Sequence, residues 1–208
     1  MDEKRIHEIL TYLFALVIAI PVHEFAHARS AVSYGDDTPR LDGRLTIFPW
    51  DHFDLFGGAM CIISSIVGFG IGWGKPVRVN PVNLRHPRWD GVKIAAWGPF
   101  SNLLLAIAFA IPLRFGLLGD NRSLYDLIEV CVFVNLGLLM FNMIPIHPLD
   151  GSKVLAGFLP DELAYRYGRF MAQWGPMLLM LLVFGGHGVI RTFVWEPAVR
   201  IAALLIGS

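Results

Sequence analysis

The chain has 208 residues, of which 55% are hydrophobic and 16% charged, and its formal net charge is zero. Soluble domains are about half apolar and about a quarter charged, so this composition favours a protein of the lipid bilayer. The length suits one domain or a single bundle of membrane helices. A zero net charge without any basic run excludes nucleic acid as the expected partner.

Six apolar segments follow one another along the chain, at about residues 8–33, 55–74, 92–118, 124–145, 163–185 and 188–208. A spanning helix needs about 20 mostly uncharged residues, so we expect an all-α polytopic membrane protein with about four to six membrane segments. The charged last stretch is a doubtful span. The first apolar run continues without a small-x-small cleavage site, which favours a retained membrane helix over a signal peptide.

The polar, turn-rich stretch GDDTPRLDGRLTIFPWDHFD separates the first two apolar segments. Its Asp42-Gly43 pair, between RL and RLTIF, predicts a small β-hairpin around residues 40–48. The second apolar segment is interrupted by several glycines. Cys61 and Cys131 lie far apart inside apolar stretches, which indicates packing residues and not a disulfide or a zinc knuckle.

His23, Glu24 and His27 form an H-E-x-x-H motif towards the C-terminal end of the first apolar segment. On a helix, residues i and i+4 share a face, so both imidazoles can bind one metal ion. The glutamate between them is close enough to take a proton from a metal-bound water. Ionisable side chains in an apolar helix cost about 2–3 kcal/mol each unless paired or functional, which argues against a merely solvated helix end.

A catalytic zinc site needs a third protein ligand and an open position for water. Asp150 is favoured by its surroundings, NMIPIHPLDG, where two prolines break the helix and Gly151 permits a close approach. Irregular backbone at membrane depth is tolerated only where it lines a protein cavity. The alternative is that Asp150 only caps the helix that follows it. The other ionisable candidates in or beside apolar segments are His52, Glu129, His147 and His187.

The three motifs HEFAH, WGPFSN and NMIPIHPLDG together resemble the site-2 protease family of intramembrane zinc metalloproteases. That family combines an H-E-x-x-H helix with a later N-x-x-P-x-x-D-G-type motif. The resemblance covers about residues 8–160 and is to the short prokaryotic type without a PDZ or nucleotide-sensing domain. We therefore expect one intramembrane metalloprotease domain over residues 1–208, with the catalytic core at about 8–160 and C-terminal membrane-associated helices at 161–208.

This resemblance implies a zinc-dependent endopeptidase that hydrolyses peptide bonds in or near the transmembrane segments of membrane-protein substrates. It implies one zinc ion, Zn2+, held by His23, His27 and Asp150, with Glu24 as the general base that activates a zinc-bound water.

Three further residues have a role that the resemblance leaves open. Asn102 and Asn142 match family asparagines near the site, as substrate-orienting or oxyanion-stabilising donors. Hydrogen bonds between helices are the alternative for both. His147 stands where relatives usually have proline, and is a supporting hydrogen-bond partner, a competing ligand or an exposed loop residue.

The metal site constrains the topology of the chain. For HEFAH and Asp150 to meet, the first and fourth apolar segments must run in the same direction, with an odd number of crossings between them. We therefore expect segment 55–74 to re-enter the membrane. Eleven Lys and Arg then lie on the side of the active site and five on the other. This bias places the active site towards the cytoplasmic face of the cell membrane.

Two other functions could use the same ligands. A metal transporter usually has repeated halves with paired broken helices, and the sequence contains no such repeat. A catalytically silent binding protein has no use for Glu24. For a protease, the predicted hairpin at 44–48 could offer an edge strand to an extended substrate.

Overall fold

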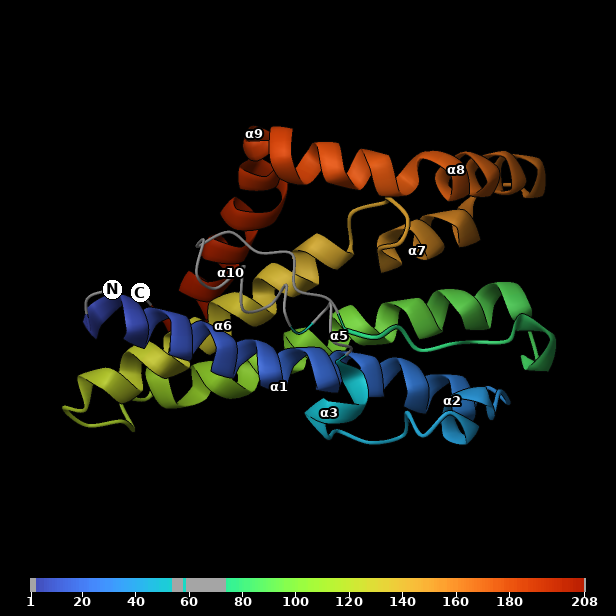
Figure 1. The fold of residues 1–208 in the computed structure, drawn as a ribbon. Helices are drawn as coiled ribbons and strands as arrows, with labels where there is room; N and C mark the ends of the chain where they lie inside the picture. Colours follow the sequence, from blue (N-terminus) through green and yellow to red (C-terminus); the bar gives the residue numbers. More distant parts are fainter. Residues whose placement is uncertain (1–2, 54–57, 59–73, 208) are drawn as a thin grey trace.

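Three long apolar helices form the centre of the computed structural model, which describes residues 3–53, 58 and 74–207. They are α1 (Glu3–Ser33), α5 (Pro87–Arg114) and α6 (Arg122–Asn142), and each is long and apolar enough to cross a bilayer. In Figure 1, α1 and α6 run in one direction and α5 in the other. The protein is therefore an integral membrane protein in which α1 and α6 are parallel, as the topology argument requires.

The shorter elements connect and cover these three helices. Between α1 and α5 lie α2 (Thr38–Leu41), α3 (Pro49–His52) and the 3-10 helix η1 (Pro81–Asn83). After α6 come α7 (Asp150–Phe158), α8 (Asp161–Gly185), α9 (His187–Ile190), the π-helical turn η2 (Arg191–Trp195) and α10 (Glu196–Ile206). Figure 1 shows α7 between α5 and α8, so α8 stands apart from the α1–α5 pair.

Small side chains let the helices approach closely. One buried cluster joins α1 to α6 and includes Ala15, Ala19 and Cys131. Another joins α5, α6 and α10, where Ala106 and Ala198 are fully buried. Helix association in a bilayer depends on van der Waals packing, which close backbone approach improves.

The predicted β-hairpin at 40–48 is wrong. Residues 38–41 form α2, 49–52 form α3, and the described residues contain no strand. The Asp42-Gly43 turn exists, but Gly43 has φ +69° and the N–H of Arg44 donates to the carbonyl of Pro39 at 2.8 Å. A glycine in this left-handed conformation ends a helix, so the turn closes α2 and does not join two strands.

The predicted number of membrane segments is too high for the described residues. They contain three candidate spans, or four if α8 and residues 187–206 form one bent span. The two parts of that pair meet at 87°, so the last two apolar segments are one broken unit. The proposed re-entrant segment 55–74 lies outside the described residues apart from Gly58 and Gly74.

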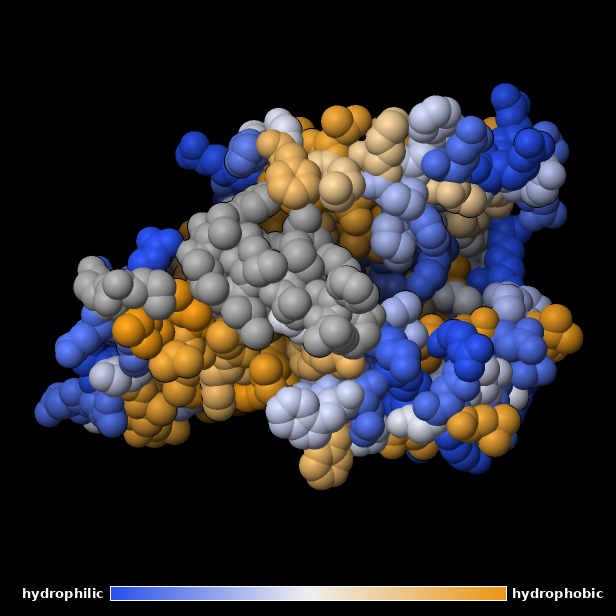
Figure 2. Space-filling view, viewed as in Figure 1, coloured by the Kyte–Doolittle hydropathy of each residue, from blue (hydrophilic) through white to orange (hydrophobic). Residues whose placement is uncertain are grey.

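The surface agrees with a bilayer location. Figure 2 shows apolar side chains over the N-terminal part of α1, with hydrophilic side chains gathered towards the two ends of the molecule. Large exposed apolar residues on α1 and α5 include Leu10, Phe14, Leu104 and Ile111. Such a band between polar ends is what hydrocarbon contact requires.

Candidate metal centre

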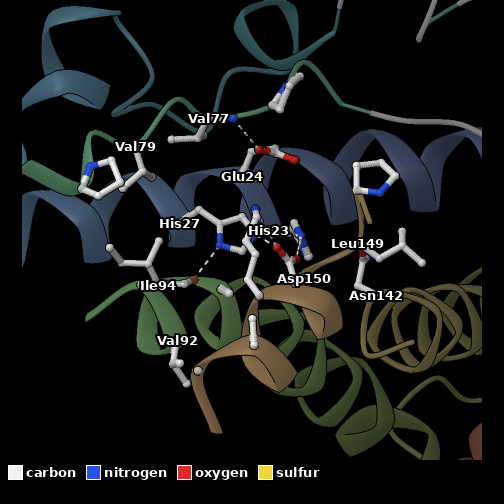
Figure 3. A pocket seen from close by; sticks show the side chains of 18 of the residues that line it. His23, Glu24, His27, Val77, Val79, Val92, Ile94, Asn142, Leu149 and Asp150 are labelled. Carbon is white, nitrogen blue, oxygen red and sulfur yellow. Dashed lines mark hydrogen bonds and ion pairs between the residues drawn. The ribbon is translucent and has the colours of Figure 1, made fainter. Parts of the chain in front are cut away.

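The H-E-x-x-H motif lies on α1, where the spacing of four residues puts both imidazoles on the same face of the helix. His23 and His27 are buried and point towards α5 and α7 (Figure 3). Their Nε2 atoms are 3.0 Å apart. Their rings meet edge to face, with centroids 4.6 Å apart.

Asp150 reaches these histidines because α6 ends early. The helix stops at Asn142, residues 143–149 are irregular, and Asp150 opens α7. Gly151 packs so closely on the carbonyls of Met143 and Ile144 that a Cβ there would overlap them. The side chain of Asp150 points at the histidines, and no side-chain bond caps the start of α7.

Three ligand atoms converge at this point. Asp150 Oδ2 lies 3.2 Å from His23 Nε2 and 3.1 Å from His27 Nε2. Tetrahedral ligands at the usual zinc–nitrogen and zinc–oxygen distances are about 3.3 Å from one another. The triangle therefore fits a zinc ion to within a few tenths of an ångström. Among the described residues, His23, His27 and Asp150 are the one group of three or more His, Cys, Asp or Glu side chains whose ligand atoms lie close enough together to hold a metal ion.

The far nitrogen of each imidazole has a hydrogen-bond acceptor. His27 Nδ1 lies 2.7 Å from the carbonyl oxygen of Ile94, and His23 Nδ1 lies 2.7 Å from Asn102 Oδ1. Oxygen acceptors require a proton on each Nδ1, so each imidazole in its neutral form has its lone pair on Nε2. Two such lone pairs and a carboxylate oxygen repel one another unless a cation lies between them, so the donor set is suited to a metal.

Asp150 is held as a carboxylate. Burial raises the pKa of this carboxyl, but His27 and His23 in their protonated form outweigh burial and bring the pKa far below its usual range. A metal cation bound to neutral imidazoles would act on this carboxyl in the same direction. Lys153 Nζ lies 3.4 Å from Asp150 Oδ1, the oxygen that faces away from the histidines. Oδ2 is therefore the oxygen available as a ligand.

Gly98 of α5 forms the floor of the centre. A Cβ at this position would overlap the imidazoles of both His23 and His27. Only a residue without a side chain lets α5 lie this close to the ligand-bearing face of α1.

Glu24 lies on the wall of a cavity beside the three ligands (Figure 3). Its Oε2 accepts a hydrogen bond of 3.2 Å from the backbone N–H of Val77, in the stretch 75–80, which forms neither helix nor strand. The cavity has a volume of about 1050 Å³. Its apolar lining comes mostly from α5, from α6 and the loop after it, and from the stretch 76–84, while α1 and α7 contribute mainly polar side chains. This volume is at the upper end of the range for binding sites that bury most of a ligand.

The two asparagines of the motifs occupy different environments. Asn102 is fully buried, and its Oδ1 contacts His23. Asn142 lines the cavity, and its Nδ2 donates to Leu138 of its own helix at 3.0 Å. Asn142 is the one of the pair that a ligand in the cavity could touch.

The other candidate residues lie apart from the three ligands. His147 is half-buried against Gly175 of α8, where burial and the charge of Lys153 lower its pKa. His52 is fully buried and its Nε2 bonds to the carbonyl of Thr46. Glu129 and His187 also lie outside the ligand group.

Several contacts to His23, Asp150 and Glu24 and their neighbours were not predicted. Asn135 touches Asn102, Ile94 and Val77 act through their backbones, and Lys153 pairs with Asp150. Asn135 alone carries a signal in the sequence, because it is an amide in the middle of an apolar segment. Backbone contacts carry none.

Curated relatives share most of this chain. A protein of Bacillus subtilis named "Putative zinc metalloprotease YwhC" is 34% identical over 160 residues, which cover 73% of this chain and 71% of the relative. The chain belongs to the site-2 protease family of zinc metalloproteases. A protein of Mycolicibacterium smegmatis named "Putative zinc metalloprotease Rip2" is 30% identical over 82% of the chain and 67% of the relative.

More distant similarity extends to archaea. "Zinc metalloprotease MJ0392" of Methanocaldococcus jannaschii is 30% identical over 101 residues, which are 48% of this chain and 29% of the relative. The chain matches no family model, and no solved structure matches it. The relatives' names support zinc as the metal for the group of His23, His27 and Asp150 in this site-2 protease.

Proposed function

We propose that this site-2 protease is a zinc-dependent intramembrane endopeptidase that hydrolyses peptide bonds in or near transmembrane segments of other proteins. The observation that carries the proposal is the triangle of His23, His27 and Asp150, with sides of 3.0–3.2 Å, next to Glu24 on a cavity wall. Relatives that share most of the chain are named zinc metalloproteases. A cavity among helices of membrane-spanning length is suited to substrates from the bilayer.

His23, His27 and Asp150 would hold the zinc ion. When bound, zinc supplies Lewis-acid chemistry, which polarises a peptide carbonyl and makes water more acidic.

Glu24 is the general base in this proposal. Its carboxylate takes a proton from the attacking water and passes it to the leaving amine. The N–H of Val77 holds one carboxylate oxygen, so the side chain stays on the cavity wall. Asn142, which lines the same cavity, contacts the substrate backbone in this proposal.

The substrate must unwind before hydrolysis, because a helix hides its peptide groups. The stretch 75–80 forms neither helix nor strand, runs alongside α5 in Figure 1, and lines the cavity through Pro76, Val77 and Val79. Backbone groups outside helices and sheets can pair with an unwound peptide. This stretch therefore replaces the incorrectly predicted hairpin at 44–48 as the candidate edge for substrate.

The active site faces the cytoplasm in this proposal. The N–H of Lys75 donates to the carbonyl of His52 at 2.6 Å, so the two flanks of segment 55–74 lie at one level along α1. The basic residues of 75–93 then lie on the same side as Arg29, Arg40 and Arg44, which supports the predicted orientation in the cell membrane.

Replacing Glu24 by glutamine tests the proposal. Wild type and Glu24→Gln are co-expressed with candidate single-span substrates, and zinc content is measured on the purified chains. We expect Glu24→Gln to keep its zinc and lose cleavage by at least about 100-fold, because the amide cannot accept the proton. Equal cleavage by both chains would contradict the mechanism, and wild-type zinc binding without any cleavage would favour a binding function.

A further inference from the structure

We infer that Asn102 and Asn135 form a hydrogen-bonded relay that fixes His23 in the tautomer whose Nε2 lone pair faces the metal. The relay runs from a backbone carbonyl of α6, through α5, to the ligand on α1. The inference rests on the proposed zinc function and assigns positioning roles to two asparagines that lie outside the cavity.

The orientation of the relay begins at Cys131. Asn135 Nδ2 donates to the carbonyl oxygen of Cys131, one turn earlier in α6, at 2.9 Å. A carbonyl oxygen only accepts, so the amide nitrogen of Asn135 must face it. Asn135 Oδ1 is thereby turned towards α5.

Asn102 continues the relay in one orientation. Its Nδ2 donates to Asn135 Oδ1 at 3.0 Å and lies 3.4 Å from the carbonyl oxygen of Ala19. A flipped amide would put its oxygen against both of these oxygens, with no hydrogen between them. Asn102 Oδ1 must therefore face His23.

His23 is the end of the relay. Its Nδ1 lies 2.7 Å from Asn102 Oδ1, which can only accept, so Nδ1 carries the proton. In the neutral imidazole Nε2 then has no proton and presents its lone pair towards Asp150 Oδ2. The tautomer of His27 is fixed more directly, because its Nδ1 faces the carbonyl oxygen of Ile94.

Burial keeps the relay in this state. Asn102 and Asn135 are both 0% exposed, so water does not compete for their polar atoms. Groups behind a metal-binding histidine set its tautomer and ring orientation, and their loss typically weakens metal binding by about 10–100-fold. Bundle stabilisation alone would need the contacts between the helices but would not depend on the acceptor at His23.

Two substitutions at one position separate these roles. Asn102→Leu removes all polar contacts, whereas Asn102→Asp keeps an oxygen for His23 Nδ1–H and loses the donors to Asn135 and Ala19. Asn135→Leu removes the outer member, and Ser101→Ala is a control that loses a buried hydroxyl bonded only within α5. Zinc affinity is measured on the purified full chain by chelator competition, and the unfolding midpoint is measured on the zinc-free chain.

We expect Asn102→Leu to weaken zinc binding by about 10–100-fold, and Asn102→Asp to recover to within about threefold of wild type. Asn135→Leu should weaken zinc binding by a smaller factor, about 3–10-fold, because Asn102 can then flip. Ser101→Ala should bind as wild type does. If Asn102→Leu does not fold, the zinc affinity of Asn102→Asp decides between the two roles. Affinity within about threefold of wild type supports the relay, and a larger loss contradicts it.

A purely structural role predicts the opposite pattern, in which Asn102→Asp is as unstable and binds zinc as weakly as Asn102→Leu. That result, or wild-type affinity in Asn102→Leu, would overturn the relay. The proposed function is tested separately by Glu24→Gln, so a failed relay leaves it standing. A wild-type chain that binds no zinc would overturn both.

Discussion

Gly98 controls the metal centre through the side chain that it lacks. The imidazoles of His23 and His27 occupy the space that a Cβ would need. We predict that Gly98→Ala weakens zinc binding by about 10–100-fold, since at least one ligand ring must move. Chelator competition on the purified chain measures this loss. Gly91→Ala, where a Cβ meets nothing within 4 Å, is the matched control on α5; similar zinc affinity in both variants would contradict the close-packed floor.

Asp36 ties the end of α1 to the stretch that carries Val77. This buried carboxylate accepts hydrogen bonds from the hydroxyl of Thr38 at 2.6 Å, the N–H of Asn80 at 2.7 Å and the amide of Asn83 at 2.9 Å. Burial raises its pKa, but these hydrogen bonds outweigh burial, and the pKa lies below the ordinary value of 3.8. The stabilisation is therefore complete above the ordinary value and is lost as pH falls through the lowered pKa.

Asp36→Asn tests this linkage. We predict that it lowers the free energy of unfolding by about 1–3 kcal/mol at neutral pH, with a smaller difference in acid. Thermal unfolding of both chains at neutral pH and near pH 3 gives the comparison. Asp37→Asn, which changes only a surface pair with Arg40, is the control. A difference between Asp36→Asn and wild type that stays constant with pH would contradict the assignment.

At the scale of elements, α7 is placed by contacts at both of its ends. At its N-terminus, Gly151 packs on the end of α6. Near its C-terminus, the Arg88 guanidinium of α5 donates to the carbonyls of Gly157 and Leu159 and to Asp161 at 2.6 Å. Arg88 thus links α5, α7 and α8 on the far side of the helix that carries Asp150.

We predict that Arg88→Gln loosens α7 and costs about 1–2 kcal/mol of stability, because a partly exposed guanidinium network contributes modestly. Faster amide hydrogen exchange in 151–158 is the direct readout, and cleavage should slow by about threefold to tenfold. Arg85→Gln is the control, since Arg85 makes no side-chain hydrogen bond among the described residues. Unchanged exchange in α7 would show that Gly151 alone positions this helix.

The elements also show where sequence reasoning succeeds. Helical spacing and apolar length were enough to predict α1, α5 and α6, because these signals are local. The hairpin failed since Asp42-Gly43 ends a helix as readily as it joins strands, and Pro39, near the start of α2, favours the helix. The bend after Gly185 was also not predicted, because the length of an apolar segment does not show the direction in which its helix runs.

The candidate site also has parts that the sequence predicts and parts that it does not. His23, Glu24, His27 and Asp150 are in recognisable motifs, and the structure brings the three candidate ligands together. The parts that orient them are backbone groups and Asn135, whose positions depend on how the helices pack. Tertiary contacts of this kind leave little or no mark on a single sequence.

For the whole molecule, α1 and α6 run parallel (Figure 1) as the predicted topology requires, while the cytoplasmic orientation is a prediction from the distribution of Lys and Arg. We predict that a cysteine in place of Arg85 resists an impermeant maleimide added outside intact cells, whereas one in place of Asp120 reacts. Both substitutions are made in a chain that also carries Cys61→Ala and Cys131→Ala, so that the introduced cysteine is the only thiol the maleimide can label. Outside labelling at position 85 with protection at position 120 would reverse the orientation.

The central claim is that two imidazoles and one carboxylate, His23, His27 and Asp150, hold one zinc ion. X-ray absorption at the zinc edge of the purified full chain, beside His27→Ala, tests it most directly. We predict about one zinc per chain with only nitrogen and oxygen ligands at about 2.0–2.2 Å and two imidazole contributions, and loss of one contribution or of the metal in the variant. Sulfur ligation, or an unchanged spectrum at full occupancy in His27→Ala, would contradict it.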